Sequence, residues 1–131
     1  MVIGTGAPRA RRPLDAVDRR NVAEEIESLE REQFNKLESA LRLLMLHRLK
    51  WDQQPVLRSR RWVLSIEAQR LELEEVMADN PGLKPCIPEA VARGYRKARL
   101  AAAKEPGIDE ELLPETCPHD WNDLTSRVVS L

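Results

Sequence analysis

Apolar residues recur every three or four positions between residues 18 and 51, a stretch that contains no Pro or Gly. At about 100° per residue this spacing lines a single face of an α-helix. The stripe consists of Val22, Ile26, Leu29, Gln33, Leu37, Ala40, Leu44, His47 and Trp51. It predicts a long helix over about residues 18–52, with Asp15 or Asp18 as its N-cap and an end before Pro55.

The character of this helix changes at about Ala40. The face opposite the stripe is charged, and we expect it to be solvated. It consists of Glu24, Glu27, Arg31, Glu38 and Arg42. After Ala40 further leucines make the helix apolar nearly all round: Leu41, Leu43, Leu46 and Leu49. We therefore expect other helices to enclose the second half, while the first half has one apolar face.

Two more helices follow. Ser59 is a suitable N-cap for a second helix that runs to about Ala78. Its inward stripe is Trp62, Ile66, Gln69, Leu73 and Val76 or Met77. The turn sequence Asp-Asn-Pro-Gly at residues 79–82 precedes a third helix from about Pro88 to about Lys104. Its inward face is Val91, Tyr95 or Gly94, Ala98 and Ala102, and these small residues permit close approach to a neighbouring helix.

The C-terminal residues predict an extended strap with Leu112, Leu113 and Cys117 tucked in, then a short helix from about His119 that uses Trp121 and Leu124. The expected fold class is all-α. It is an antiparallel helical bundle in which two further helices, the strap and the short helix pack the long helix. Residues 1–13 are broken by Gly and Pro and predict a flexible N-terminal arm, with residues 14–131 forming a single helical domain.

Composition narrows the class of protein. Lys and Arg number 21 against 22 Asp and Glu, so no global field attracts nucleic acid or a membrane. The longest near-apolar run, residues 41–49, contains Arg42, His47 and Arg48, and it is too short and too charged to span a bilayer. No secretory signal precedes Cys86 and Cys117, which favours a cytoplasmic protein with reduced thiols.

A set of short segments points to a known family. They are Leu14-Asp15, residues 21–29, residues 46–51, Gln54-Pro55, residues 58–60 with Trp62, Asn80-Pro81 to Pro85, residues 95–99 and residues 114–118. In this order they cover nearly the whole chain from Leu14 onward and resemble the bacterial Domain of Unknown Function family 29. The resemblance implies an all-α fold and brings no established reaction, ligand or catalytic residue.

The start of the chain departs from that family. Members usually carry a further helical segment before the position of Leu14, where this chain has the sequence MVIGTGAPRARRP. The resemblance therefore implies a bundle that lacks one wall. We expect part of the stripe between Ile26 and Leu37 to be uncovered.

His47 is the most notable polar residue, because it lies on the stripe between Leu44 and Trp51. We interpret it as a buried structural histidine that bonds to a neighbouring helix or to the strap, with a catalytic or ligand role as the alternative. Cys86 and the pair Cys117 and His119 could join it around a metal, but they lack the paired spacing of zinc ligands. We predict no metal and no cofactor.

A basic cluster lies between the first two helices. It consists of Arg58, Arg60, Arg61 and Trp62, and the N-terminal arm adds Arg9, Arg11 and Arg12. Arginine and tryptophan together can stack on nucleic acid or bind an acidic partner. The alternative is a solvated link whose arginines pair with Asp52 and with glutamates.

Three functions remain open. We favour a small non-enzymatic protein that acts through protein–protein interaction or self-association. Its expected interaction surface is the stripe Val22, Ile26, Leu29, Gln33 and Leu37. A nucleic-acid-associated regulator or antitoxin-like protein that uses the basic clusters is the second hypothesis, and an enzyme that uses His47 is the third. We expect no membrane partner.

Overall fold

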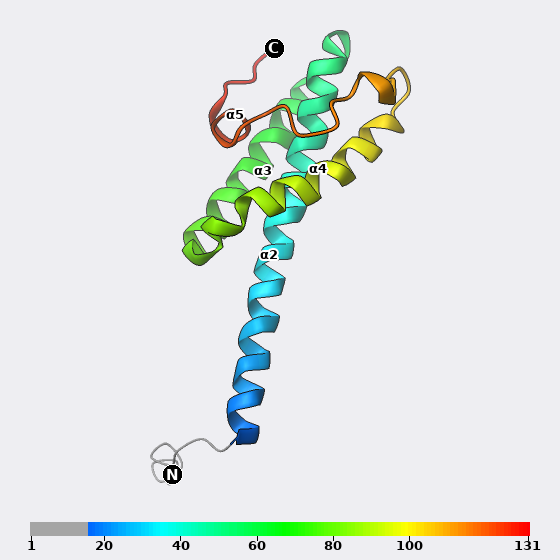
Figure 1. Cartoon of the computed structure of the whole chain (residues 1–131). Helices are drawn as coiled ribbons and strands as arrows, with labels where there is room; N and C mark the ends of the chain where they lie inside the picture. The colour runs from blue at the N-terminus through cyan, green and yellow to red at the C-terminus, as the bar shows by residue number, and fades with distance from the viewer. Residues whose placement is uncertain (1–15) are drawn as a thin grey trace. The chain divides into compact units, whose positions relative to one another are not determined.

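The computed structural model describes residues 16–131, and within them it contains helices and no strand (Figure 1). The elements are α2 (Ala16–Gln53), η1 (Pro55–Leu57), α3 (Arg60–Asp79), η2 (Pro81–Cys86), α4 (Ile87–Ala103), η3 (Glu110–Leu112) and α5 (Trp121–Ser126), where η denotes a 3-10 helix. The predicted all-α class and the three principal helices are confirmed. The predicted arm, residues 1–13, and the candidate cap Asp15 lie outside the described residues.

The helix bounds agree closely with the pattern of breaking and capping residues. Ser59 caps α3, since its Oγ accepts a hydrogen bond from the backbone N–H of Trp62 at 3.3 Å. Asp120 caps α5 in the same way, with Oδ1 accepting from the N–H of Asp123 at 2.7 Å. Because α2 already begins at Ala16, Asp18 is inside the helix, and its prediction as N-cap is wrong.

The chain divides into two compact units, of which the first ends at Glu32 and the second is Gln33–Leu131. Helix α2 contributes to both. In the second unit its apolar residues form the core with α3, α4 and the C-terminal segment. The core residues of α2 are Leu37, Ala40, Leu41, Leu44, Met45, Leu49 and Trp51. This burial confirms the enclosed second half of the long helix.

Small residues let α4 approach α2 closely. Ala90, Gly94, Ala98 and Ala102 are all buried on one face of α4. A Cβ added at Gly94 would lie 3.1 Å from Cε of Met45 and 3.3 Å from the backbone oxygen of Glu38. The predicted close approach of this helix to a neighbour is therefore confirmed, and it depends on the missing side chain at Gly94.

The same approach buries Glu38, which the sequence placed on a solvated face. Its carboxylate pairs with Lys97 of α4 and, at 3.6 Å, with Nε of Arg93. That prediction is wrong because two cations from α4 cover the carboxylate in place of water. Ion pairing compensates the desolvation that burial of a lone carboxylate would cost.

The C-terminal strap is fixed by hydrogen bonds to α4. The hydroxyl of Tyr95 donates to the carbonyl of Pro114, and Nε of Arg99 donates to the same oxygen at 3.0 Å. Leu113 is buried and Cys117 is half-buried, as predicted. Leu112 is exposed, against prediction, because η3 turns the chain so that Leu113 alone of this pair enters the core.

Candidate functional site

The predicted interaction stripe begins as an exposed apolar seam in the first unit. Val22, Ile26 and Leu29 lie one turn apart on α2, with exposed fractions of 43%, 51% and 59%. The carboxylates of Glu25 and Glu32 lie on one side of this face and that of Glu30 on the other, and all three are exposed. We call these six residues the acid-flanked seam.

The other two members of the predicted stripe belong to the second unit and are not free for a partner. Leu37 is completely buried in its core. Gln33 is half-buried, and its Oε1 accepts a hydrogen bond from Nδ2 of Asn80 at 2.8 Å. The prediction of an open surface is wrong for Leu37 because the second unit's own helices cover it.

The predicted basic cluster is divided by its surroundings. Arg58 donates from Nε to the carbonyl of Trp51 at 2.8 Å, and its guanidinium stacks 4.6 Å from the centre of the Trp51 ring. Trp62 is half-buried, with Nζ of Lys50 5.0 Å from its ring centre. Arg60 and Arg61 are exposed. Arg58 therefore contacts Trp51 rather than the acidic residues that the sequence suggested.

His47 is half-buried, and its prediction as a buried polar residue is wrong. Its Nδ1 donates to the carbonyl of Leu43 one turn earlier on the same helix, at 2.8 Å. The expected partner on a neighbouring helix or on the strap is therefore replaced by the backbone of α2. A role for His47 as a ligand or a catalyst stays a prediction.

The buried polar groups are elsewhere, and the strongest is Arg48. Only 1% of this residue is exposed. Its Nη1 donates to the carbonyl of Asp123 at 3.0 Å and its Nη2 donates to the carboxylate of the same residue at 3.1 Å. Arg70 of α3 reaches the same turn, with Nε donating to the carbonyl of Leu124 at 2.8 Å. Two arginines thus tie α5 to α2 and α3.

One nitrogen of Arg48 is left over. Its Nε is buried and has no hydrogen-bond partner among residues 16–131. Leaving a buried donor without an acceptor costs about 1–3 kcal/mol, so residues 16–131 do not fully satisfy the hydrogen-bonding groups of Arg48.

His119 and Asp52 form a second polar contact between the strap and α2. Nε2 of His119 donates to Oδ2 of Asp52 at 2.7 Å, and the histidine is buried. Burial and the charge of Arg48 oppose the charged ring, but hydrogen bonds with Asp52 and Cys117 and the charge of Asp52 outweigh them and raise the pKa of His119 to about 9. Burial also opposes the ionised form of Asp52, yet His119 lowers the pKa of this carboxyl. The pair is charged at neutral pH.

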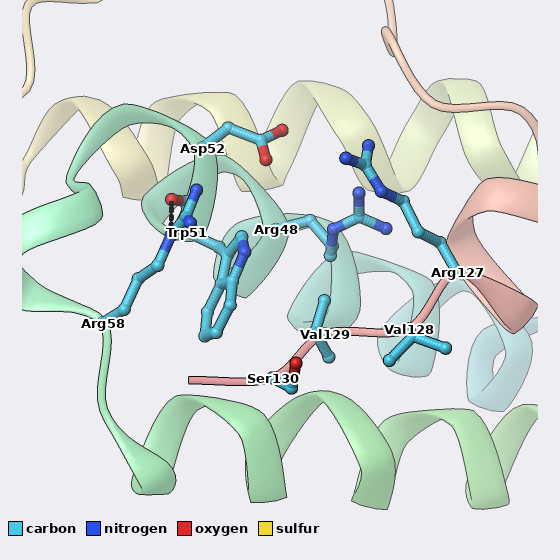
Figure 2. A pocket seen from close by; sticks show the side chains of 8 residues that line it. All are labelled: Arg48, Trp51, Asp52, Arg58, Arg127, Val128, Val129 and Ser130. Carbon is cyan, nitrogen blue, oxygen red and sulfur yellow. Dashed lines mark hydrogen bonds between the residues drawn. The ribbon is translucent and has the colours of Figure 1, made fainter.

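A polar cavity lies beside these contacts (Figure 2). Its volume is about 190 Å³. The walls are Arg48, Trp51 and Asp52 from the end of α2, Arg58 from the link after η1, and Arg127, Val128, Val129 and Ser130 from the tail after α5. Three guanidinium groups therefore line one small space.

Two further features of residues 16–131 concern clusters of candidate metal ligands and membrane-spanning helices. These residues contain no group of three or more His, Cys, Asp or Glu side chains that could hold a metal ion. Cys117 lies against its own strap, with Sγ 3.3 Å from the backbone oxygen of His119. No helix in the same range combines the length and the hydropathy that crossing a membrane requires.

Comparison with known proteins identifies the family. The model described as "Domain of unknown function DUF29" matches residues 9–128, which is most of the chain. The chain belongs to this family. The resemblance seen in the short sequence segments is thereby confirmed, and this DUF29 domain contains the acid-flanked seam, the principal helices and the strap. No curated protein and no solved structure matches the chain.

Sequence reasoning missed the polar groups around the end of α2 in this DUF29 protein. The sequence did contain one signal for Arg48. This residue is four positions after Leu44, in the half of the long helix that is apolar nearly all round. A charge in that position implies a buried partner. The partner itself, Asp123, is 75 residues away, and no local pattern could indicate it.

Proposed function

We propose that the protein acts by binding an amphipathic helix of another protein along the acid-flanked seam. The observation that carries this proposal is the presence of three exposed apolar side chains on consecutive turns with carboxylates on both sides. A helix with apolar residues at the same spacing would bury them, and Lys or Arg beside its stripe would pair with Glu25, Glu30 and Glu32.

The charges favour such a partner over a second copy of this chain. In a helix pair of the coiled-coil type, the residues that flank the apolar stripe face each other across the interface. Two copies would place Glu25 of one chain close to Glu30 of the other, and like charges in that arrangement destabilise the pair. A basic partner removes this repulsion, and oppositely charged surfaces also increase the rate of association.

The expected affinity is weak. Each of the three side chains is already about half-buried, so complete burial contributes about 1 kcal/mol per residue. Association also costs translational and rotational freedom. We therefore expect a transient contact, with a Kd no tighter than about 100 µM for an isolated partner helix, since that value already requires ~5.5 kcal/mol.

The test uses a synthetic probe. It is a fluorescein-labelled helical peptide of three heptads, with Leu at the positions that meet the apolar side chains and Lys at the positions that flank them. Gln takes the position that would face Arg19, an exposed residue three positions before Val22 on the same face of α2. The full chain is titrated into the labelled peptide while the fluorescence anisotropy is measured. A control peptide that carries Glu at the flanking positions is measured in the same way. We expect the basic peptide to bind and the acidic peptide to bind at least about tenfold more weakly, which corresponds to ~1.4 kcal/mol.

Two matched variants localise the contact. Leu29→Asp should abolish binding of the basic peptide, whereas Leu71→Asp on α3 should leave it unchanged, and the wild-type residues are 59% and 61% exposed. Equal binding of both peptides, or binding that survives Leu29→Asp, would show the proposal to be wrong. Sedimentation equilibrium tests whether a second copy of the chain occupies the seam instead. A dimer in the wild type that dissociates in Leu29→Asp would show that the seam binds a second copy and not a partner helix.

We place this binding in the cytoplasm. Cys86 and Cys117 are both free thiols, which is the state that a reducing compartment maintains. The nucleic-acid hypothesis stays a prediction that depends on Arg60, Arg61 and the arginines of residues 1–13.

A further inference from the structure

The polar cavity at the end of α2 is separate from the acid-flanked seam and belongs to the second unit. Figure 2 shows Arg48 and Arg127 on one side of it, Arg58 beyond the ring of Trp51, and Asp52 above. Its volume of about 190 Å³ is far above the ~10–15 Å³ that one water molecule needs. A small ligand with several polar atoms therefore fits.

The hydrogen-bond donors of the arginines around this space are only partly used within residues 16–131. Nε of Arg48 is buried without a partner among residues 16–131. Arg58 uses Nε for the carbonyl of Trp51, and the stacking on Trp51 holds its two terminal nitrogens in place for other acceptors. Arg127 is 66% exposed, and its nearest carboxylate contact is Nη1 to Oδ1 of Asp123 at 3.9 Å, which is beyond hydrogen-bond distance.

The charge around the cavity is positive. Arg48, Arg58 and Arg127 line it, and Asp52 is the one carboxylate among its eight lining residues. Asp52 is already neutralised by His119 at 2.7 Å. Asp123, which does not line the cavity, is shared between Arg48 and Arg127. Two carboxylates thus face three guanidinium groups and a charged imidazole, so an anion would complete the charge balance.

We infer that this cavity binds a compact phosphate-class oxyanion, either inorganic phosphate or the phosphate group of a small monoester. Guanidinium groups present planar pairs of N–H donors that match phosphate oxygens, and they approach this space from more than one side. The terminal nitrogens of Arg58 and the guanidinium of Arg127 supply the hydrogen bonds, and the buried guanidinium of Arg48 adds a third positive charge.

Isothermal titration calorimetry of the full chain tests this inference. The ligands are inorganic phosphate, phenyl phosphate and acetate, at constant ionic strength and neutral pH. We expect phosphate to bind with a Kd below about 10 mM and acetate to bind at least about tenfold more weakly. Tighter binding of phenyl phosphate than of phosphate would assign the site to monoesters, and the reverse order to the free ion.

Arginine variants show whether phosphate binds in this cavity or elsewhere on the protein. Arg127→Gln and Arg58→Gln should each weaken phosphate binding about tenfold, ~1.4 kcal/mol. The double variant Arg60→Gln and Arg61→Gln, which removes two exposed arginines outside the cavity lining, should bind like wild type. Circular dichroism melting confirms that each variant is folded. Absence of binding at about 20 mM phosphate, equal binding of acetate, or an unchanged Kd in Arg127→Gln would overturn the inference.

Discussion

Helix α2 carries the same apolar spacing through two regions with opposite surroundings. In residues 16–32 the stripe residues Val22, Ile26 and Leu29 are exposed, whereas in the second unit Leu37 and Leu44 are completely buried. The flanking residues explain the difference. The first region has one apolar residue per turn between glutamates, but the second adds Leu41, Met45 and Leu49 around the helix. Periodicity thus predicts a helix, while the width of the apolar face predicts whether the chain itself covers it.

The largest expected change in stability is the one between a substitution in the core and a substitution in the seam. Leu44→Ala should lower the free energy of unfolding by about 2–5 kcal/mol, because it leaves a cavity in a closely packed core. Ile26→Ala should change it by less than about 0.5 kcal/mol, because half of that side chain already contacts solvent. Urea denaturation followed by circular dichroism measures both. A loss of more than 1.5 kcal/mol in Ile26→Ala, about three times that bound, would mean that the seam is covered in solution.

A smaller loss of stability is expected from a substitution that disturbs the close contact of α4 with α2. Gly94→Val should destabilise the protein by about 1–3 kcal/mol, since the new side chain meets Met45 and the backbone of Glu38. Gly82→Ala is the control, because a Cβ there has no atom within 4 Å, and its effect should stay within about 0.5 kcal/mol. Similar midpoints for wild type and Gly94→Val would show that the two helices can separate at little cost.

The smallest expected effect is the pH-dependent contribution of the contact between His119 and Asp52 to the stability of the second unit. The pKa of His119 is raised from 6.5 to about 9, so the charged histidine stabilises the folded state fully below pH 6.5. This contribution is lost as pH rises through 9. A tenfold change in proton affinity corresponds to ~1.4 kcal/mol, and Asp52 is partly exposed, so about 2 kcal/mol is the upper bound.

His119→Gln keeps a hydrogen-bond donor toward Asp52 and removes the titration. The stability difference from wild type should therefore be greatest below pH 6.5 and should vanish above about pH 9. An NMR titration of the His119 ring checks the cause, because Asp52→Asn should bring the pKa of His119 back toward or below 6.5. A histidine that titrates at the same pH in Asp52→Asn would contradict this account.

Much of the architecture was predictable because it depends on near neighbours in the chain. Ser59 and the prolines at 55, 81 and 88 delimit helices through contacts within a few residues. The stripes of α3 and α4 were correctly assigned for the same reason. The acid-flanked seam was also predictable, since Val22, Ile26 and Leu29 and their glutamates lie within three turns of one helix.

The candidate sites of the second unit depended on contacts between distant segments. Asp52 and His119 are 67 residues apart, and Arg48 and Asp123 are 75 apart. The errors have the same origin: Lys97 buries Glu38 from 59 residues away, and Arg48, held by Asp123, enters the core where the sequence had suggested His47. Local spacing determined the helices and their apolar faces, because these follow from the geometry of 3.6 residues per turn. Only the tertiary structure decided which polar side chains are buried and paired, because that requires partners which the fold brings together.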